Sequence, residues 1–393
     1  MAIAIKLAIF VNNEIMGMIF RQVSYRLNTI LLVLCFAHSA MGITNIAGDT
    51  YPFVSKTFVQ ASYHRGSMYP HHEYLRFFNH DYINGFELQL AKSFPHLRPH
   101  RPPVIGVGLY HSGLGNRDIY GTITGLNFAF ISNYFSLGNV FTLGSTVSSG
   151  VSYASKPYDP DSNPFNQAIG SRLNALIIVS IDFKINVDNS LSLFVSPTYT
   201  HSSNGKMKLP NTGLNLYALQ VGASYTINQK EIVPISPELP AKVSSRARII
   251  GLYAAGVRQN SKRNPFAEFA SSSMLEFTYS LNANHRIGFG GDIFQSTNIT
   301  KNLNELQLAE ADYTTTYGVH LAYEIVWGKL SFALQPGYMV VPNSLTPSRI
   351  FKRVGIRYNV YDGFFVNCSL KATQFAADYI EWGVGYNLNF LKR

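Results

Sequence analysis

Apolar and polar residues alternate one by one along much of this chain, and this two-residue period constrains the fold more than any other feature. Successive side chains of a β-strand point to opposite faces, so an alternating stretch has one apolar face and one polar or small face. In the stretch 378–391 one parity carries large apolar side chains, and the other carries Glu, Gly and Asn. The apolar set is Ile380, Trp382, Val384, Tyr386, Leu388 and Phe390. Residues 330–338 repeat the pattern, which predicts amphipathic strands.

About sixteen runs of residues are typical of strands by this criterion. They lie at 52–64, 83–92, 104–112, 119–132, 139–153, 172–187, 190–203, 214–227, 246–258, 271–282, 285–295, 315–326, 329–340, 349–360, 363–373 and 378–391. The predicted fold class is all-β, and the predicted architecture is a transmembrane antiparallel β-barrel with roughly 12–16 strands.

Composition indicates where the apolar faces point. Aromatic residues make up 13% of the chain and charged residues only 14%, whereas about 25% is usual for a soluble domain. Mean hydropathy is only +0.03, and no mature segment is apolar for about 18 residues, so helical membrane spans are not expected. Strands with a lipid-facing side reconcile these values. A soluble β-sandwich would explain the alternation, but not the low charge, the aromatic content and the N-terminal signal together.

The N-terminal region is typical of an exported protein. A short apolar run follows Arg21 and Arg26 and ends in the small-x-small site Ala40-Met41-Gly42, which predicts a signal peptide over 1–42. The barrel would then cover 43–393, and the predicted location is the outer membrane of a Gram-negative bacterium. The net charge of +10 suits anionic lipid headgroups, and nucleic acid is not an expected partner there.

Loop lengths support the barrel. Outer-membrane barrels have short turns at one end and long loops at the other, and connections such as Asp188-Asn189 and 154–171 alternate in this way. The stretch 228–245 is long and Pro-rich where a short turn is expected. It is either a plain loop or a seam between 43–230 and 246–393, which show no sequence repeat.

Residues 201–215 carry the strongest functional signal. His201 and Ser203 are two apart on a predicted strand, so they share a face with Cβ atoms roughly 6.5 Å apart. A hairpin centred on Lys208 places Asn215 opposite His201 on the next strand. Base, nucleophile and orienter then have the arrangement of a serine hydrolase. All three share the parity of the apolar, lipid-facing side, at the end of the strand predicted to lie at the extracellular rim.

The motif His-x-Ser-Asn-Gly followed by Pro-Asn-x-Gly resembles the PagL-type lipid A deacylases, also called acyloxyacyl hydrolases. The resemblance covers roughly residues 60–230 and includes Gly66–Glu73, Gly85–Leu88 and Gly113–Asn116. It implies an outer-membrane serine esterase that acts on lipid A or lipopolysaccharide. Carried over residue by residue, it implies that His201 is the general base, Ser203 the nucleophile, and Asn204 with the backbone of Gly205 the oxyanion site.

One position departs from that family. The best-characterised members have Glu where this chain has Asn215. An Asn orienter in this motif instead resembles outer-membrane phospholipase A, which keeps a phospholipid substrate as an alternative. No Ser-rich calcium segment follows the motif, and we expect no cofactor and no metal. The cluster His71-His72-Glu73 does not fit a zinc spacing and favours a solvated loop.

A second class of function is a non-catalytic pore or transport barrel. Rings of inward Arg or Lys would favour a pore, but the inward faces that the sequence reveals are mostly Ser, Gly, Asn and Gln. The sequence therefore favours the esterase and leaves the oligomeric state open.

Overall fold

The computed structural model describes residues 53–95, 104–232, 245–260, 267–299, 311–341, 348–373 and 376–392. The predicted signal peptide 1–42 and most of the stretch 228–245 lie outside these ranges. Sixteen strands and one short helix, α2 (Glu73–Phe78), are found within them, and every strand pair is antiparallel. The predicted all-β, antiparallel barrel class is thus confirmed.

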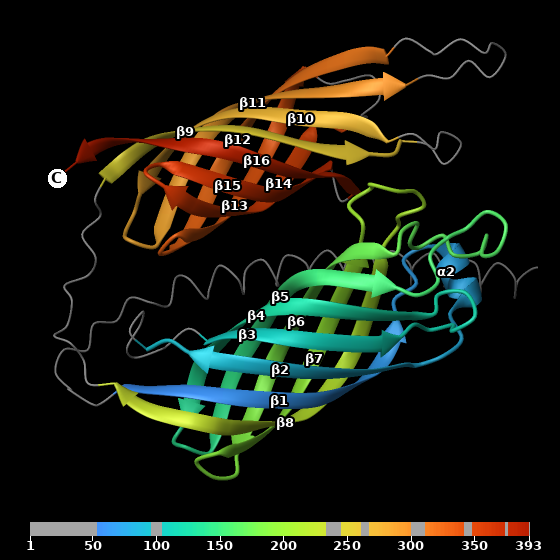
Figure 1. Ribbon diagram of the computed structural model, residues 1–393, viewed down its shortest axis with the longest axis vertical. Helices are drawn as coiled ribbons and strands as arrows, with labels where there is room; N and C mark the ends of the chain where they lie inside the picture. The colour runs from blue at the N-terminus through green and yellow to red at the C-terminus, as the bar shows by residue number, and fades with distance from the viewer. Residues whose placement is uncertain are drawn as a thin grey trace, which may run out of the picture. The chain divides into compact units, whose positions relative to one another are not determined.

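The strands close into two barrels of eight (Figure 1). The first comprises β1 (Phe53–Met68), β2 (Ile83–Ser93), β3 (Val104–Gly113), β4 (Thr122–Leu137), β5 (Phe141–Ala154), β6 (Leu173–Asn186), β7 (Leu191–Ser203) and β8 (Leu214–Ile232). The second comprises β9 (Ser245–Arg258), β10 (Glu268–Ser280), β11 (His285–Ile299), β12 (Ala311–Trp327), β13 (Leu330–Val341), β14 (Ile350–Tyr361), β15 (Phe364–Thr373) and β16 (Ala376–Lys392).

The strand pairing shows that each half of the chain, β1–β8 and β9–β16, closes into a barrel of its own. Strand β8 pairs with β1 from Phe53↔Ile232 to Met68↔Leu216, and β16 pairs with β9. Each half therefore satisfies its own edge strands, which would otherwise carry a row of unpaired N–H and C=O groups. The division falls in the stretch 228–245, so the sixteen strands do not form the single barrel that a plain loop there would allow.

Both barrels expose their apolar faces. In β2, buried and exposed residues alternate along the whole strand, and Phe86, Leu88 and Leu90 are among the exposed ones. In β16, Trp382 and Val384 are 67% and 63% exposed. Such an apolar outer surface suits hydrocarbon rather than water. Within the described ranges no helix has the length and apolar character needed to cross a membrane.

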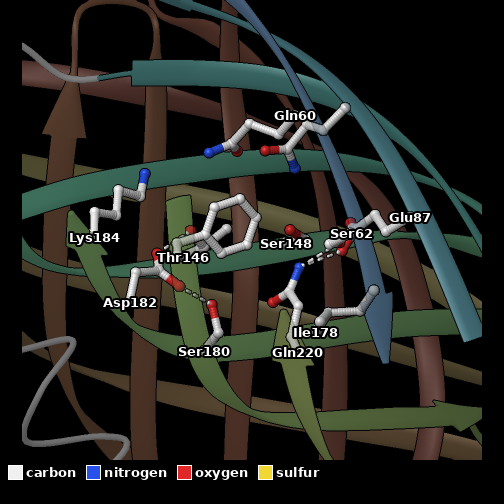
Figure 2. A pocket seen from close by; sticks show the side chains of 12 residues that line it. Gln60, Ser62, Glu87, Thr146, Ser148, Ile178, Ser180, Asp182, Lys184 and Gln220 are labelled. Atoms are coloured by element: carbon white, nitrogen blue, oxygen red, sulfur yellow. Dashed lines mark hydrogen bonds between the residues drawn. The ribbon is translucent and has the colours of Figure 1, made fainter. Parts of the chain in front are cut away.

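The interior of the first barrel is polar and nearly filled. Figure 2 shows two hydrogen-bonded groups facing each other across it, one around Asp182 and one around Gln220. Asp182 accepts from Ser180 at 2.7 Å, and Gln220 donates to Ser62 at 2.8 Å. The cavity between them holds only about 20 Å³, as expected for a barrel of about eight strands.

The interior of the second barrel holds a network of ion pairs, which the sequence interpretation missed. Its cations are Arg248, Arg258, Arg286, Arg353, Arg357 and Lys371. Its carboxylates are Glu276, Asp292, Glu324, Asp378 and Glu381. Inward Arg and Lys are therefore present, but each of these cations is paired with a carboxylate instead of forming a charged ring around an open pore.

An apolar cluster closes one end of the first barrel. It joins strand ends such as Met68 and Leu214 to the loop residues Leu114 and Ile169 and to Leu75 of α2. All five are at most 2% exposed. This packing holds the long loops against the strand ends, and the hairpin between β7 and β8 lies at this end.

Candidate active site

Strands β7 and β8 bring the predicted residues together. Their register pairs His201 with Asn215 and Tyr199 with Tyr217, which confirms the predicted hairpin centred on Lys208. The even residues of β7 from Phe194 to Ser202 are buried in the barrel, whereas Leu193, Val195 and Pro197 are exposed. His201 and Ser203 share the odd parity and therefore lie on the outer face.

The side chains form a hydrogen-bonded chain. His201 Nδ1 is 2.7 Å from Asn215 Oδ1, and His201 Nε2 is 3.0 Å from Ser203 Oγ. An amide oxygen only accepts, so Nδ1 of a neutral His201 carries the proton and Nε2 has a free lone pair. That lone pair accepts from the Ser203 hydroxyl, as a general base must.

Two further residues hold Asn215. Tyr199 donates its hydroxyl to Asn215 Oδ1 at 2.8 Å, and Asn215 Nδ2 is 3.2 Å from His71 Nδ1. The interpretation of His71 as part of a solvated loop was therefore wrong. No motif in the sequence signals this contact, because His71 is 144 residues from Asn215 and approaches it only when β1 closes the barrel against β8.

The loop after Ser203 is tightly organised by Asn204. Its side-chain amide donates to Ser171 Oγ at 2.8 Å and to the Lys208 carbonyl at 2.7 Å. Its backbone N–H donates to Asn211 Oδ1 at 2.9 Å. An Asn side chain has only two N–H bonds to offer, so this arrangement leaves none on Asn204 for an oxyanion, contrary to the sequence expectation. The backbone N–H of Gly205 stays a predicted donor.

Gly213 lies against the imidazole of His201. Its φ is +81°, and a Cβ added there would lie 2.9 Å from His201 Cε1. Only glycine combines this backbone conformation with so close an approach. The Gly213 N–H also donates to the Ala168 carbonyl at 3.0 Å, which fixes the backbone in place.

If His201 has the general-base role that the sequence predicts, we expect Gly213→Ala to lower kcat by about 10²-fold, since a displacement on the order of 1 Å at such a group has this cost. Gly138→Ala is the matched control, because Gly138 also has positive φ (+55°) but nothing within 4 Å of its added Cβ. Steady-state hydrolysis of a lipid ester by the two folded variants checks the prediction. Equal losses in both would mean that backbone strain, not the His201 contact, matters.

A second Ser–His pair lies inside the first barrel. His64 Nε2 is 3.4 Å from Ser62 Oγ and 3.4 Å from Glu87 Oε2, so both partners face one ring nitrogen. A hydrolase needs them on opposite nitrogens. All three side chains are buried in the barrel interior, away from any lipid.

A larger cavity, of about 500 Å³, opens among the loops at the same end. The charged residues that line it are Asp118, Lys156, Asp159, Arg172 and Lys208. Ser171 and Lys208, the two residues that accept from the Asn204 amide, belong to this lining. Asn204, the residue that follows Ser203, is thus hydrogen-bonded to two residues of the cavity lining.

Fold and site together define a class: a membrane β-barrel with a hydrogen-bonded Asn–His–Ser chain on its outer face. Comparison with known families agrees. The family model "Lipid A 3-O-deacylase (PagL)" matches residues 84–224, and "Acyloxyacyl hydrolase, C-terminal domain" matches residues 247–390. The two matches cover more than half of the chain, which belongs to this PagL-type family of outer-membrane hydrolases. The match therefore extends into the second barrel, beyond the 60–230 region that the motifs indicated.

Solved structures share the barrel character at low similarity. The chain is 8% identical to Omp33 of Acinetobacter baumannii (TM-score 0.17; 86% of this chain, 100% of that chain). It is 9% identical to the translocator domain of NalP from Neisseria meningitidis (TM-score 0.21; 92% and 96%). For CdiB of Acinetobacter baumannii the identity is 10% and the TM-score 0.19, with 86% of this chain covering 60% of that one. Among curated protein sequences none matches.

Proposed function

We propose that this protein is a serine esterase that removes the 3-O-linked acyl chain of lipid A, with Ser203 as nucleophile, His201 as general base and Asn215 as orienter. The observation that carries the proposal is the continuous hydrogen-bonded chain from Asn215 through His201 to Ser203 on the outer face of the first barrel. The family to which the chain belongs supports the choice of lipid A.

In the proposed reaction, His201 Nε2 takes the Ser203 proton while Oγ attacks the acyl carbonyl. The negative charge that develops on the carbonyl oxygen is stabilised by N–H donors of the turn after Ser203. In this turn Gly205 and Lys206 both have positive φ (+62° and +69°), and Met207 N–H donates to the Asn204 carbonyl at 3.2 Å. The imidazolium then protonates the departing 3-hydroxyl, and water, activated by His201, releases the fatty acid.

The position of the site supports a lipid rather than a soluble ester. Ser203 lies at the end of a largely apolar outer stripe of β7 and is itself 9% exposed. An acyl chain lying along this stripe would approach Ser203 while its tail stays in hydrocarbon. A phospholipid would satisfy the same argument, and outer-membrane phospholipase activity is the second candidate because the orienter is Asn. A pore is disfavoured by the filled first barrel and by the paired charges in the second.

We further propose that the loop cavity receives the phosphorylated sugar of lipid A. The cations that line it, Lys156, Arg172 and Lys208, outnumber its two Asp residues. Arg and Lys are the usual partners of phosphate oxygens. Because Asn204 donates hydrogen bonds to two residues of the cavity lining, a headgroup bound there would lie beside the ester that Ser203 attacks.

Lys208→Gln is accordingly expected to raise KM for lipid A by about three- to tenfold with little change in kcat, the loss of one exposed charge-assisted contact. Hydrolysis of an uncharged p-nitrophenyl ester should not change. Lys329→Gln, at an exposed residue in the turn between β12 and β13, is the control. A kcat loss on the uncharged ester would instead indicate damage to the Asn204 loop.

The function itself is tested by mass spectrometry of lipid A from cells that express wild-type protein or Ser203→Ala. Loss of one 3-O acyl chain with wild type alone is the expected result, and the mass difference identifies the chain. Free fatty acid from phospholipid with unchanged lipid A would move the assignment to phospholipase. No hydrolysis by membrane-inserted wild type would leave the non-catalytic barrel as the better description.

A further inference from the structure

An Asn orienter poses a problem that a carboxylate does not, because its two ends are chemically opposite. If the Asn215 amide turned over, Nδ2 instead of Oδ1 would face His201 Nδ1. An N–H facing Nδ1 requires a lone pair there, so the ring proton would move to Nε2. His201 could then no longer accept the Ser203 proton. A residue that fixes the amide is therefore needed.

Tyr199 cannot fix the amide by itself. Its hydroxyl lies 2.8 Å from Asn215 Oδ1, but a hydroxyl both donates and accepts, and its hydrogen rotates to suit its partner. It would accept from Nδ2 as readily as it donates to Oδ1. The contact restrains the position of Asn215 and leaves its orientation open.

The contacts of His71 favour one polarity of its ring, whereas those of Tyr199 favour none. Its Nε2 is 3.0 Å from the Thr212 carbonyl, which only accepts, so Nε2 of the neutral ring carries the proton. Nδ1 then has a lone pair and lies 3.2 Å from Asn215 Nδ2. Nδ1 also lies 3.2 Å from the Tyr69 carbonyl, so both ring nitrogens face a carbonyl oxygen. The Tyr69 carbonyl already accepts from the His71 backbone N–H at 3.1 Å, and the shorter contact of Nε2 with Thr212 takes the single proton of the neutral ring.

Thr212, whose carbonyl begins this series of hydrogen bonds, is itself held in place. Tyr74 of the loop helix α2 donates to the Thr212 hydroxyl at 2.6 Å, and burial raises the pKa of the Tyr74 phenol, which keeps it a donor. The backbone N–H of Tyr69 donates to the Asn215 carbonyl at 2.7 Å. Along the path from Thr212 through His71, Asn215 and His201 to Ser203, donor and acceptor therefore alternate; the one opposing contact is that of His71 Nδ1 with the Tyr69 carbonyl.

We propose that His71 is a positioning residue: it selects the orientation of the Asn215 amide and, through it, the tautomer of His201 that accepts the Ser203 proton. The inference rests on the proposed function for its catalytic consequence, but the tautomer itself is independent of any substrate. It also assigns a role to the first loop of the barrel, which carries His71 to the site from outside the β7–β8 hairpin.

The test compares His71→Ala, His71→Asp and the control His80→Ala, an exposed histidine of the same loop. His71→Ala is expected to lower kcat about ten- to a hundredfold, below the roughly 10⁴-fold cost of a fully wrong tautomer, with KM nearly unchanged. His71→Asp, which restores an acceptor opposite Asn215 Nδ2, should recover most of the loss. Failure of Asp to recover more activity than Ala would count against the proposal.

A double-mutant cycle separates orientation from simple packing. In the Asn215→Asp background both ends of the side chain accept, so no orientation has to be selected. There His71→Ala should cost less than about threefold, and the difference from its cost beside Asn215 is the coupling. Equal losses in the two backgrounds would overturn the proposal, because they would show that His71 merely supports the loop.

Nitrogen-15 NMR of ¹⁵N-histidine-labelled protein in micelles gives a readout without substrate. Wild type should show His201 protonated at Nδ1, and His71→Ala should show a mixture of the two tautomers. An unchanged tautomer in His71→Ala would refute the proposal even if activity fell. If wild type hydrolyses no lipid, the proposed function fails, whereas the NMR result still decides the role of His71.

Discussion

Replacing Ser203 with alanine is expected to lower kcat/KM for lipid A by about 10⁴-fold or more, because loss of the nucleophile alone removes nearly everything that such a triad contributes. Ser203 Oγ is the only triad atom that bonds to the acyl group in the proposed reaction, and His201 Nε2 has no other proton to take. Thermal stability should hardly change, since the substitution removes a single hydrogen bond, the 3.0 Å contact with His201, and this contact lies at the end of a strand. The measurement is acyl release from purified lipid A in mixed micelles.

Two serines in the same barrel serve as matched controls. Ser62 contacts His64 inside the barrel, and Ser202, the neighbour of Ser203, points inward and lies 2.8 Å from Ser152 Oγ. Neither Ser62→Ala nor Ser202→Ala should lower kcat by more than a few-fold in protein that inserts normally. A large loss in Ser62→Ala with activity retained in Ser203→Ala would move the nucleophile into the barrel and refute the lipid-facing site.

The largest stability effect is expected at Arg353 in the second barrel. Its Nε donates to Glu381 at 2.5 Å and its Nη1 donates to Asp292 at 2.9 Å, and the residue is 1% exposed. Arg353→Met leaves two buried carboxylates without this cation. We expect the free energy of unfolding to fall by about 3–5 kcal/mol, the usual cost of breaking a buried ion pair from one side.

Urea unfolding in the presence of lipid vesicles checks this, and the chain offers a selective probe. Its two Trp residues, Trp327 and Trp382, both belong to the second barrel, so Trp fluorescence follows the unfolding of that barrel. Arg349→Ala, at an exposed arginine just before β14, should change stability by less than about 0.5 kcal/mol. Adding Asp292→Asn and Glu381→Gln to Arg353→Met should recover part of the loss. No recovery would mean that lost packing, rather than unpaired charge, explains the effect.

The site illustrates which contacts local sequence can predict. His201, Ser203 and Asn215 lie on one hairpin, where strand period and turn position fix both the face and the register, so their convergence followed from spacing. His71 was misjudged because its partners Thr212 and Asn215 are distant in the sequence, and Asn204 because loop packing occupies both N–H bonds of its side chain. Asn204 bonds to Lys208 within its own loop, but its bond to Ser171 depends on how that loop packs against the loop before β6.

The sequence by itself determined the class of fold, the faces of the strands and the pairing of His201 with Asn215, because a two-residue period and a hairpin register are local properties of the chain. Only the tertiary structure decided that the strands close as two barrels, that Arg353 and its carboxylates share one interior, and that His71 meets Asn215. Each of these depends on which distant strand edges pair, and edge pairing between strands that both alternate apolar and polar residues is not specified by the alternation itself.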